Sequence, residues 1–197
     1  MKQFIMFILL FFVFFQLSVF AQNKDILVIE SYHGEYSWDA SYKKGLEEVI
    51  GNKYNLKYFE MNTKRLPKSK HEQRAQKAWK EYKKLDPALV ILGDDNAIKY
   101  LGSKFVDTKT PVVYLGINNN PRFYNVHGHK NITGVLERPL MKRSIKYLDE
   151  FLGIKKILVL FDSGKTSQVT KSEIFQDQNS QKILGIRVDV KLLDNYD

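Results

Sequence analysis

The sequence predicts an α/β fold in which parallel strands alternate with helices. Four short apolar runs stand out: ILVI (26–29), ALVIL (88–92), VVYLGI (112–117) and KILVLF (156–161). They are continuous rather than alternating, as is typical of parallel strands covered on both faces. Segments with helical spacing separate the runs, and this order favours right-handed crossovers within a parallel sheet.

Four segments carry apolar residues at the spacing of a helix face. The stripes are Tyr42, Leu46, Val49 and Ile50; Ala75, Ala78, Trp79 and Tyr82; Ile98, Leu101 and Phe105; and Met141, Ile145, Leu148 and Leu152. Two further segments have the pattern of strands. YNLKYFEMN (54–62) alternates less cleanly and is expected nearer a sheet edge, and IRVDVKLL (186–193) is expected to be the last strand.

The N-terminus has the features of a secretory signal. Lys2 precedes an apolar stretch from Phe4 to Phe15, and Val19 and Ala21 suit the positions before a cleavage site. The apolar core is shorter than the ~20 residues that a spanning helix needs. We therefore expect a signal peptide over residues 1–21 and export to the periplasm or another extracytoplasmic location, with an uncleaved membrane anchor as the alternative.

Composition bounds the kind of domain and its partners. The chain has no cysteine, so an exported domain of this sequence must be stabilised by its core rather than by disulfides. The net charge of +9 raises the possibility of a nucleic-acid partner. However, the lysines of KAWKEYKK (77–84) lie opposite the apolar face of a helix, which is typical of a solvated surface, as we also expect for the basic run 64–74. Together with export, this favours no nucleic-acid partner.

Polar side chains follow four of the predicted strands where each ends. The segments are SYHGEYSW (31–38), GDDN (93–96), NNN (118–120) and DSGKTS (162–167). Asp and Asn are common helix caps and turn formers, so each segment alone indicates little. Ligands of open α/β sheets bind beyond the carboxyl ends of the strands. Four such segments on one rim therefore predict a binding cleft.

The first of these segments is rich in aromatic residues. It contains Tyr32, His33, Tyr36 and Trp38 but only one glycine, whereas a turn that binds a pyrophosphate needs several glycines. Aromatic side chains offer apolar area and stacking surfaces to a small ligand. The alternative to this binding role is that Trp38 lies in the core beneath the first helix and that Asp94 and Asn96 only cap a helix.

The sequence does not support a motif for catalysis, metal binding or cofactor binding. GKTS (164–167) lacks the glycine that a phosphate-binding loop requires five positions before Gly164, where Val159 stands. HGH (127–129) is typical of an exposed loop rather than a metal site. Asp94 and Asp95 are adjacent, so their side chains diverge at a helix start instead of forming an acid–base pair. We therefore expect that the protein is not an enzyme and that it binds neither a cofactor nor a metal ion.

Four segments together resemble a known family in order and spacing. They are ILVIESYHGEYSWDASYKKGLEEVI, ILGDDNAIKYLGSKF, PVVYLGINNNP and ITGVLERPLMKRSIKYLDEFLGIKKILVLFDSGKTS, which cover roughly residues 25–170. They are similar to the exported solute-binding proteins of ABC transporters with the type I periplasmic-binding fold. The closest subgroup also serves as the extracytoplasmic sensor of membrane histidine kinases. Gly164 and Lys165 of the DSGKTS loop depart from the resemblance, because they have no firm counterpart in the family.

The resemblance implies two three-layer α/β lobes, with parallel sheets, that close on a small molecule. The first lobe would span residues 22–136, the hinge crossing 137–139 and a partial second lobe 140–197. The second lobe would have only two strands, at 156–161 and 186–193, and would thus be incomplete. The resemblance assigns ligand contacts to Ser31, Tyr32, His33, Trp38, Asp94, Asp95, Asn96, Asn118, Asn119, Asp162, Ser163 and Thr166.

The function that follows is capture of a small, amino-acid-like solute for uptake through an ABC transporter permease. An aspartate, Asp94 or Asp95, can pair an amine, and helix N-termini can hold a carboxylate. The alternative is a ligand-sensing domain that acts on a signalling kinase module, and an exported enzyme with a similar fold is a third hypothesis.

Overall fold

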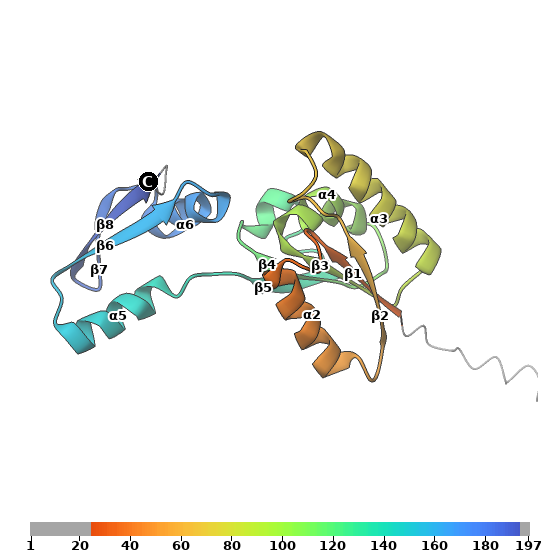
Figure 1. Cartoon of the computed structure of the whole chain (residues 1–197), viewed down its shortest axis with the longest axis horizontal. Helices are drawn as coiled ribbons and strands as arrows, with labels where there is room; N and C mark the ends of the chain where they lie inside the picture. The colour runs from red at the N-terminus through yellow and green to blue at the C-terminus, as the bar shows by residue number, and fades with distance from the viewer. Residues whose placement is uncertain (1–24, 194–197) are drawn as a thin grey trace, which may run out of the picture.

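The computed structural model describes residues 25–193, which form two separate β-sheets. The first sheet has five parallel strands in the order β2-β1-β3-β4-β5 (Figure 1). They are β1 (Asp25–Glu30), β2 (Asn55–Glu60), β3 (Leu89–Gly93), β4 (Val112–Ile117) and β5 (Ile132–Leu136). The predicted parallel α/β fold is confirmed, and so is the edge position of the strand at 54–62. The signal peptide predicted over residues 1–21 lies outside the described residues.

Helices cover both faces of this sheet. They are α2 (Ser37–Ile50), α3 (His71–Leu85) and α4 (Asp94–Phe105). Figure 1 shows α2 on one face and α3 with α4 on the other. Along β1, Ile26 and Val28 pack toward α2, while Leu27 and Ile29 pack toward α3 and α4. Since both faces of the central strands are buried, successive residues must all be apolar, which explains the continuous runs.

Two short 3₁₀ helices connect elements near the carboxyl ends of the strands. They are η1 (Lys68–Lys70), which leads into α3, and η2 (Pro121–Tyr124), which follows β4. The N-cap of η2 is Asn120, whose side chain accepts a hydrogen bond from the Arg122 backbone N–H at 3.1 Å. These connections place side chains from η1 and η2 beside the rim where the strands end.

The second sheet has three strands in the order β6-β8-β7. Its elements are α5 (Met141–Leu152), β6 (Lys156–Asp162), α6 (Lys165–Phe175), β7 (Ser180–Ile183) and β8 (Ile186–Leu193). β6 and β8 are parallel, and β7 pairs with β8 in the antiparallel direction. The prediction of only two strands omitted β7. This strand, SQKI, is short and polar, and the turn that follows it uses positive φ angles at Leu184 and Gly185 without an Asn-Gly signal.

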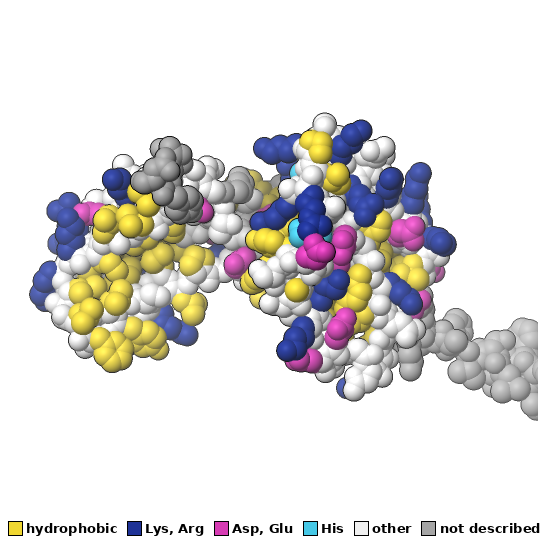
Figure 2. All heavy atoms as spheres, viewed as in Figure 1, with side chains coloured by type: hydrophobic (Ala, Val, Ile, Leu, Met, Phe, Trp, Pro, Cys, Tyr) yellow, Lys and Arg dark blue, Asp and Glu magenta, His cyan; other side chains and the backbone are white. Residues whose placement is uncertain are grey.

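One face of the second sheet is open to solvent. Ile157 and Val159 of β6 pack into a core with Phe175 of α6, whereas Leu158 and Leu160 are 55% and 54% exposed. The prediction that both faces of this strand are covered is therefore wrong for β6, because no described element lies over its second face. Figure 2 shows apolar side chains spread over this part of the surface.

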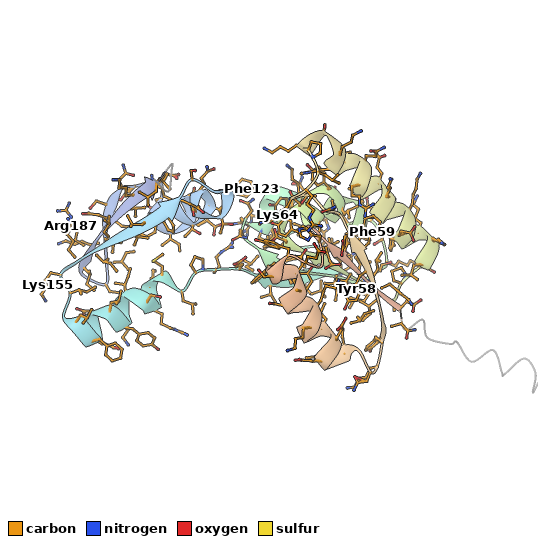
Figure 3. The ribbon with its side chains drawn as sticks, in the orientation of Figure 1. Tyr58, Phe59, Lys64, Phe123, Lys155 and Arg187 are labelled. Carbon is orange, nitrogen blue, oxygen red and sulfur yellow. The ribbon has the colours of Figure 1, made fainter. Side chains whose placement is uncertain are left out.

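A single crossing joins the two lobes, and Arg138 fastens it. The Arg138 guanidinium donates to the backbone carbonyls of Ile117 at 3.0 Å and Asn118 at 2.6 Å, and its Nε lies 3.0 Å from Glu173 of α6. One side chain thus contacts the end of β4, the crossing and the second lobe. By contrast, Lys155 and Arg187 lie at the end of the second lobe farthest from the first sheet (Figure 3).

Candidate functional site

A cleft of about 780 Å³ lies at the carboxyl ends of β1, β3 and β4. Most of its lining comes from the first lobe, and Thr166 at the start of α6 adds a contact from the second. The lining residues are Tyr32, Thr63, Leu66, Pro67, Lys68, His71, Asp94, Asp95, Asn96, Lys99, Tyr100, Asn118, Asn119, Tyr124 and Thr166. The cleft occupies the position where open α/β sheets bind ligands.

Asp94 lies at the base of this cleft in a rare backbone conformation. It is the first residue of α4, has a φ of +69° and is only 6% exposed. Non-glycine residues with such angles are strained and often mark functional positions. Its Oδ1 accepts hydrogen bonds from the Tyr32 hydroxyl at 2.8 Å and the Asp95 backbone N–H at 2.6 Å. Burial raises the pKa of Asp94 to about 6, although both hydrogen bonds act to lower it.

The second oxygen of Asp94 is open to a ligand. Its hydrogen bonds within residues 25–193 all go to Oδ1, so Oδ2 has no donor from the protein there. A carboxylate oxygen whose lone pairs accept no hydrogen bond from the protein binds an ammonium or hydroxyl group well, because the hydrogen bond is charge-assisted.

Asp95 has a different role from its neighbour. Its carboxylate accepts hydrogen bonds from the backbone N–H groups of Asn118 at 3.0 Å and Asn119 at 3.2 Å, and from the Tyr124 hydroxyl at 2.5 Å. These three donors fix the loop between β4 and η2. Of the two aspartates expected to pair an amine, geometry therefore leaves Asp94 available and Asp95 occupied.

A buried polar network supports the base of the cleft. Ser31, directly after β1, is fully buried. It donates to the Gly93 carbonyl at 2.6 Å and accepts from the Ala97 N–H at 2.7 Å, so its side chain caps the start of α4. Thr63 donates to the Ser31 carbonyl at 2.7 Å, and the Asn96 side chain donates to Thr63 at 2.9 Å. Asn96 lines the cleft, whereas Ser31 lies beneath it and acts by positioning α4.

Only one aromatic residue of segment 31–38 lines the cleft. Tyr32 does, but its ring packs edge-on against Tyr36, and the Lys64 ammonium lies 4.6 Å and 3.9 Å from the two ring centroids. The cation that these rings attract thus comes from the chain itself. The expected aromatic wall for a ligand is therefore reduced to Tyr32.

His33 and Trp38 lie outside the cleft lining. The His33 ring contacts Tyr36 edge-on at 6.1 Å. Trp38 is 37% exposed and covers the backbone of Gly116, where an added Cβ would come within 3.1 Å of the indole. Trp38 therefore fits neither of the two expected positions, since it lies over β4 rather than in the buried core or the cleft.

The second-lobe residues divide in a similar way. Thr166 lines the cleft. Asp162 accepts hydrogen bonds from the Gly164 N–H at 2.9 Å and the Ser167 hydroxyl at 2.6 Å, so it shapes the turn into α6. The Ser163 carbonyl accepts from the Gln168 side chain at 2.8 Å. Neither Asp162 nor Ser163 is among the lining residues.

Sequence reasoning missed one complete wall of the cleft. This wall comes from the segment that leads into η1, from the starts of η1 and α3, and from the second turn of α4. It consists of Leu66, Pro67, Lys68, His71, Lys99 and Tyr100. The expectation of a solvated face for the basic run 64–74 holds for Lys68 and Lys70, which are exposed, but not for His71, which is buried and lines the cleft. The proline that follows Leu66 is the signal that the run turns at this point before α3 begins.

Two further carboxylates are buried behind the cleft. Glu30 and Asp39 are both fully buried, and Lys43 lies 3.3 Å from Glu30. Asp39 accepts a hydrogen bond from the Tyr32 backbone N–H at 3.2 Å. Burial, followed by the charges of Glu30 and Asp94, raises the pKa of Asp39 to about 7. These carboxylates couple electrostatically to the cleft without lining it.

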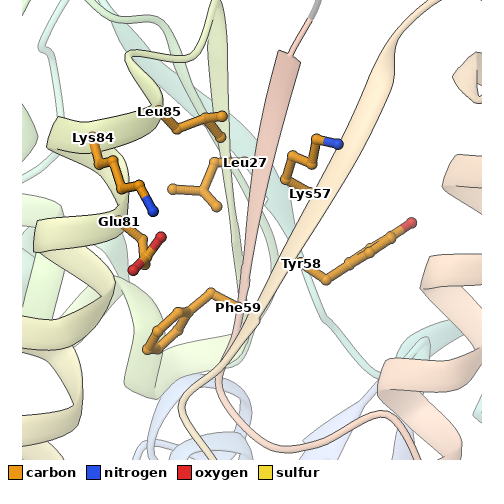
Figure 4. Close-up of a pocket in the computed structure, with 7 residues that line it drawn as sticks. All are labelled: Leu27, Lys57, Tyr58, Phe59, Glu81, Lys84 and Leu85. Carbon is orange, nitrogen blue, oxygen red and sulfur yellow. The ribbon is translucent and has the colours of Figure 1, made fainter.

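Another cavity, of about 430 Å³, lies between edge strand β2 and α3 (Figure 4). Its lining is Leu27, Lys57, Tyr58, Phe59, Glu81, Lys84 and Leu85. It opens where α3 leaves the edge strand partly uncovered, away from the carboxyl ends of the strands, and it contains none of the predicted site residues. We therefore place the candidate site in the larger cleft.

Within residues 25–193, no three His, Asp or Glu side chains are grouped so that they could hold a metal ion. In the same range, no helix has both the length and the apolar character needed to cross a membrane.

Comparison with known proteins shows similarity at the level of fold. No protein-family model matches the chain, and no curated protein matches it. Among solved structures, an ABC domain in complex with L-Trp from Streptococcus pneumoniae has a TM-score of 0.52 at 18% identity and covers 86% of this chain. A substrate-binding protein with adhesive properties from Clostridium difficile, in a ligand-free, open form, gives 0.59 at 14% identity over 87% of this chain.

A leucine-binding protein from Thermotoga maritima is similar too, with a TM-score of 0.54 at 16% identity over 88% of this chain. The chain spans 57%, 58% and 49% of the lengths of these three structures. Together with the parallel five-stranded sheet, they show that the chain has the α/β fold of type I periplasmic-binding proteins. Its structural neighbours are binding proteins rather than enzymes.

Proposed function

We propose that this chain is part of an exported protein that binds a small, amino-acid-like solute in the cleft between its lobes. The observation that carries the proposal is Asp94, whose Oδ2 is open at the base of the cleft while Tyr32 and the Asp95 N–H hold its Oδ1. A primary amine fits this oxygen, because an ammonium has several donors and carries the opposite charge.

The start of α6 supplies a complementary position for a carboxylate. Thr166 lines the cleft and lies in the first turn of α6, after the N-cap Gly164. The first turn of a helix has free N–H groups and a partial positive charge, and both favour an anion. An amine at Asp94 and a carboxylate near Thr166 would together bridge the two lobes, as a zwitterion can.

The proposed biological role is delivery of this solute to an ABC transporter permease. Support comes from the fold, and from structural neighbours that are described as substrate-binding and leucine-binding proteins. The alternative role is a ligand-sensing extracytoplasmic domain of a receptor such as a histidine kinase, since the same binding event can drive a signal instead of transport.

N-terminal sequencing of the exported protein separates these two roles. A mature N-terminus near Gln22 supports a released binding protein, whereas an intact Met1 or Lys2 in the membrane fraction supports an anchored sensor.

Solute binding itself is tested by titrating amino acids, amines, nucleosides and short peptides into the purified protein, with ligand-observed NMR as the readout. This method measures dissociation constants into the millimolar range. The proposal predicts that at least one amino acid binds and that Asp94→Asn weakens its binding. A ligand whose affinity is unchanged in Asp94→Asn would place the site elsewhere.

A further inference from the structure

The wall of the cleft formed by Leu66, Pro67, Lys68, His71, Lys99 and Tyr100 carries two lysines that have no salt-bridge partner among residues 25–193. Lys68 begins η1 and Lys99 lies in the second turn of α4, and both side chains are exposed and line the cleft. Neither forms a salt bridge with a residue in the range 25–193. The Lys99 ammonium lies 5.2 Å from the centre of the Tyr100 ring, which lines the same cleft.

The aspartates that line the cleft form no salt bridge with these lysines. Protein donors occupy both oxygens of Asp95 and one oxygen of Asp94. An amine bound to the remaining oxygen of Asp94 would satisfy that carboxylate as well. When such an amine is bound, the ammonium groups of Lys68 and Lys99 still lack a carboxylate partner in the cleft.

From these two ammonium groups without a carboxylate partner we infer that the solute is an acidic amino-acid-like molecule whose second, distal carboxylate binds between Lys68 and Lys99. This inference rests on the proposed function, because it assumes that Asp94 holds the amine. A distal carboxylate would accept charge-assisted hydrogen bonds from both ammonium groups, one from η1 and one from α4. It would thus fasten the segment before α3 to the helix that starts at Asp94.

A neutral solute would use the same wall less completely. Leu66, Pro67 and Tyr100 offer apolar contacts to an aliphatic or aromatic side chain. Such a side chain would displace water from Lys68 and Lys99 without supplying acceptors, which costs free energy. The net charge of +9 also attracts an anionic solute more strongly than a neutral one.

The test compares solutes that differ in distal charge. L-Glutamate, L-glutamine, L-leucine and O-phospho-L-serine are titrated separately into the purified protein at low ionic strength, with ligand-observed NMR as the readout. L-Glutamate and L-glutamine have the same shape, so their ratio of dissociation constants isolates the distal charge. The inference predicts that L-glutamate binds most tightly of the four.

Three variants connect that preference to the lysines. Lys68→Gln and Lys99→Gln should each weaken L-glutamate binding by roughly fivefold and leave L-glutamine within about twofold, as expected for exposed charge pairs. Lys104→Gln removes the same charge from the last turn of α4, outside the cleft lining, and should change neither solute. This control separates a local contact from the effect of total charge.

Each remaining outcome counts against a specific claim. If L-glutamine or L-leucine binds as tightly as L-glutamate, or if Lys68→Gln and Lys99→Gln behave like Lys104→Gln, the acidic assignment is wrong and the proposed function stands. Tighter binding of O-phospho-L-serine than of L-glutamate would overturn the assignment of a carboxylate. If none of the four solutes binds, the acidic assignment fails, and the wider panel of solutes then decides the proposed function independently.

Discussion

The Tyr32 hydroxyl donates to Asp94 Oδ1 at 2.8 Å and so joins the segment after β1 to the start of α4. This hydrogen bond fixes one oxygen of Asp94 and leaves the other facing the cleft. It also spans the topological switch point of the first sheet, where β1 lies between β2 and β3.

Removing this hydroxyl should change both stability and the titration of Asp94. Tyr32→Phe keeps the ring but removes one donor from a buried carboxylate, so we expect a loss of about 1 kcal/mol in the free energy of unfolding. The pKa of Asp94 should rise above its value of about 6, because the hydroxyl lowers it at present. Carboxyl-carbon NMR titration measures this pKa directly, and an unchanged value would show that the hydrogen bond does not form in solution.

Stability should fall as the pH rises from about 4 to about 8. The pKa of Asp39 is about 7 in the folded protein, above its ordinary value of 3.8. A raised pKa in the folded state favours the protonated form, so its contribution is complete below the ordinary value and is lost as the pH passes through about 7. We expect the loss to be on the order of 4 kcal/mol, because a difference of one in pKa corresponds to about 1.4 kcal/mol. Asp39→Asn should flatten the pH dependence measured by urea unfolding at pH 5 and pH 8, and an equally steep dependence in this variant would contradict the assignment.

The pair between Arg138 and Glu173 should restrict the relative motion of the lobes. Glu173→Gln removes the charge that holds α6 to the crossing, while Arg138 keeps its bonds to the backbone of the first lobe. We expect a larger radius of gyration by small-angle X-ray scattering. Glu150→Gln breaks an exposed pair within α5 and serves as the matched control. Equal radii for the two variants would mean that the pair does not constrain the lobes.

The open face of the second sheet should make the isolated chain associate. β6 is an edge strand, and its Leu158 and Leu160 are exposed, as is Phe151 of α5. Edges and apolar patches of this kind favour self-association. Sedimentation velocity should therefore show concentration-dependent oligomers that decrease in Leu158→Gln/Leu160→Gln. Val49→Gln, at an exposed position of α2, should leave them unchanged. A concentration-independent monomer would contradict this prediction.

Much of the first lobe could be predicted from sequence because its central strands are buried on both faces. A run such as ILVI at 26–29 has few alternatives to a buried parallel strand, and the polar segments after such runs must meet at one rim. The second lobe was harder to predict. β7 is short and polar, and α6 has only a weak apolar stripe, so neither leaves a clear periodic signal.

The cleft was only partly predictable for a related reason. Asp94 and Asn96 follow a strand directly, so topology alone places them at the rim. Lys68 and His71 reach the same rim through η1, and a basic run gives no sign of whether it faces solvent or a cleft. Nor does sequence show that Asp95 is occupied by Asn118, Asn119 and Tyr124, since these partners come from another strand and its connection.

The central claim is that Asp94 binds the amine of an amino-acid-like solute, and a double comparison tests it most directly. The dissociation constants of the best-binding amino acid and of its deaminated analogue are measured for the original chain and for Asp94→Asn. Our account predicts that the original chain prefers the amino acid by about tenfold, the size of one charge-assisted hydrogen bond, and that this preference disappears in Asp94→Asn. The same preference in both proteins would contradict it.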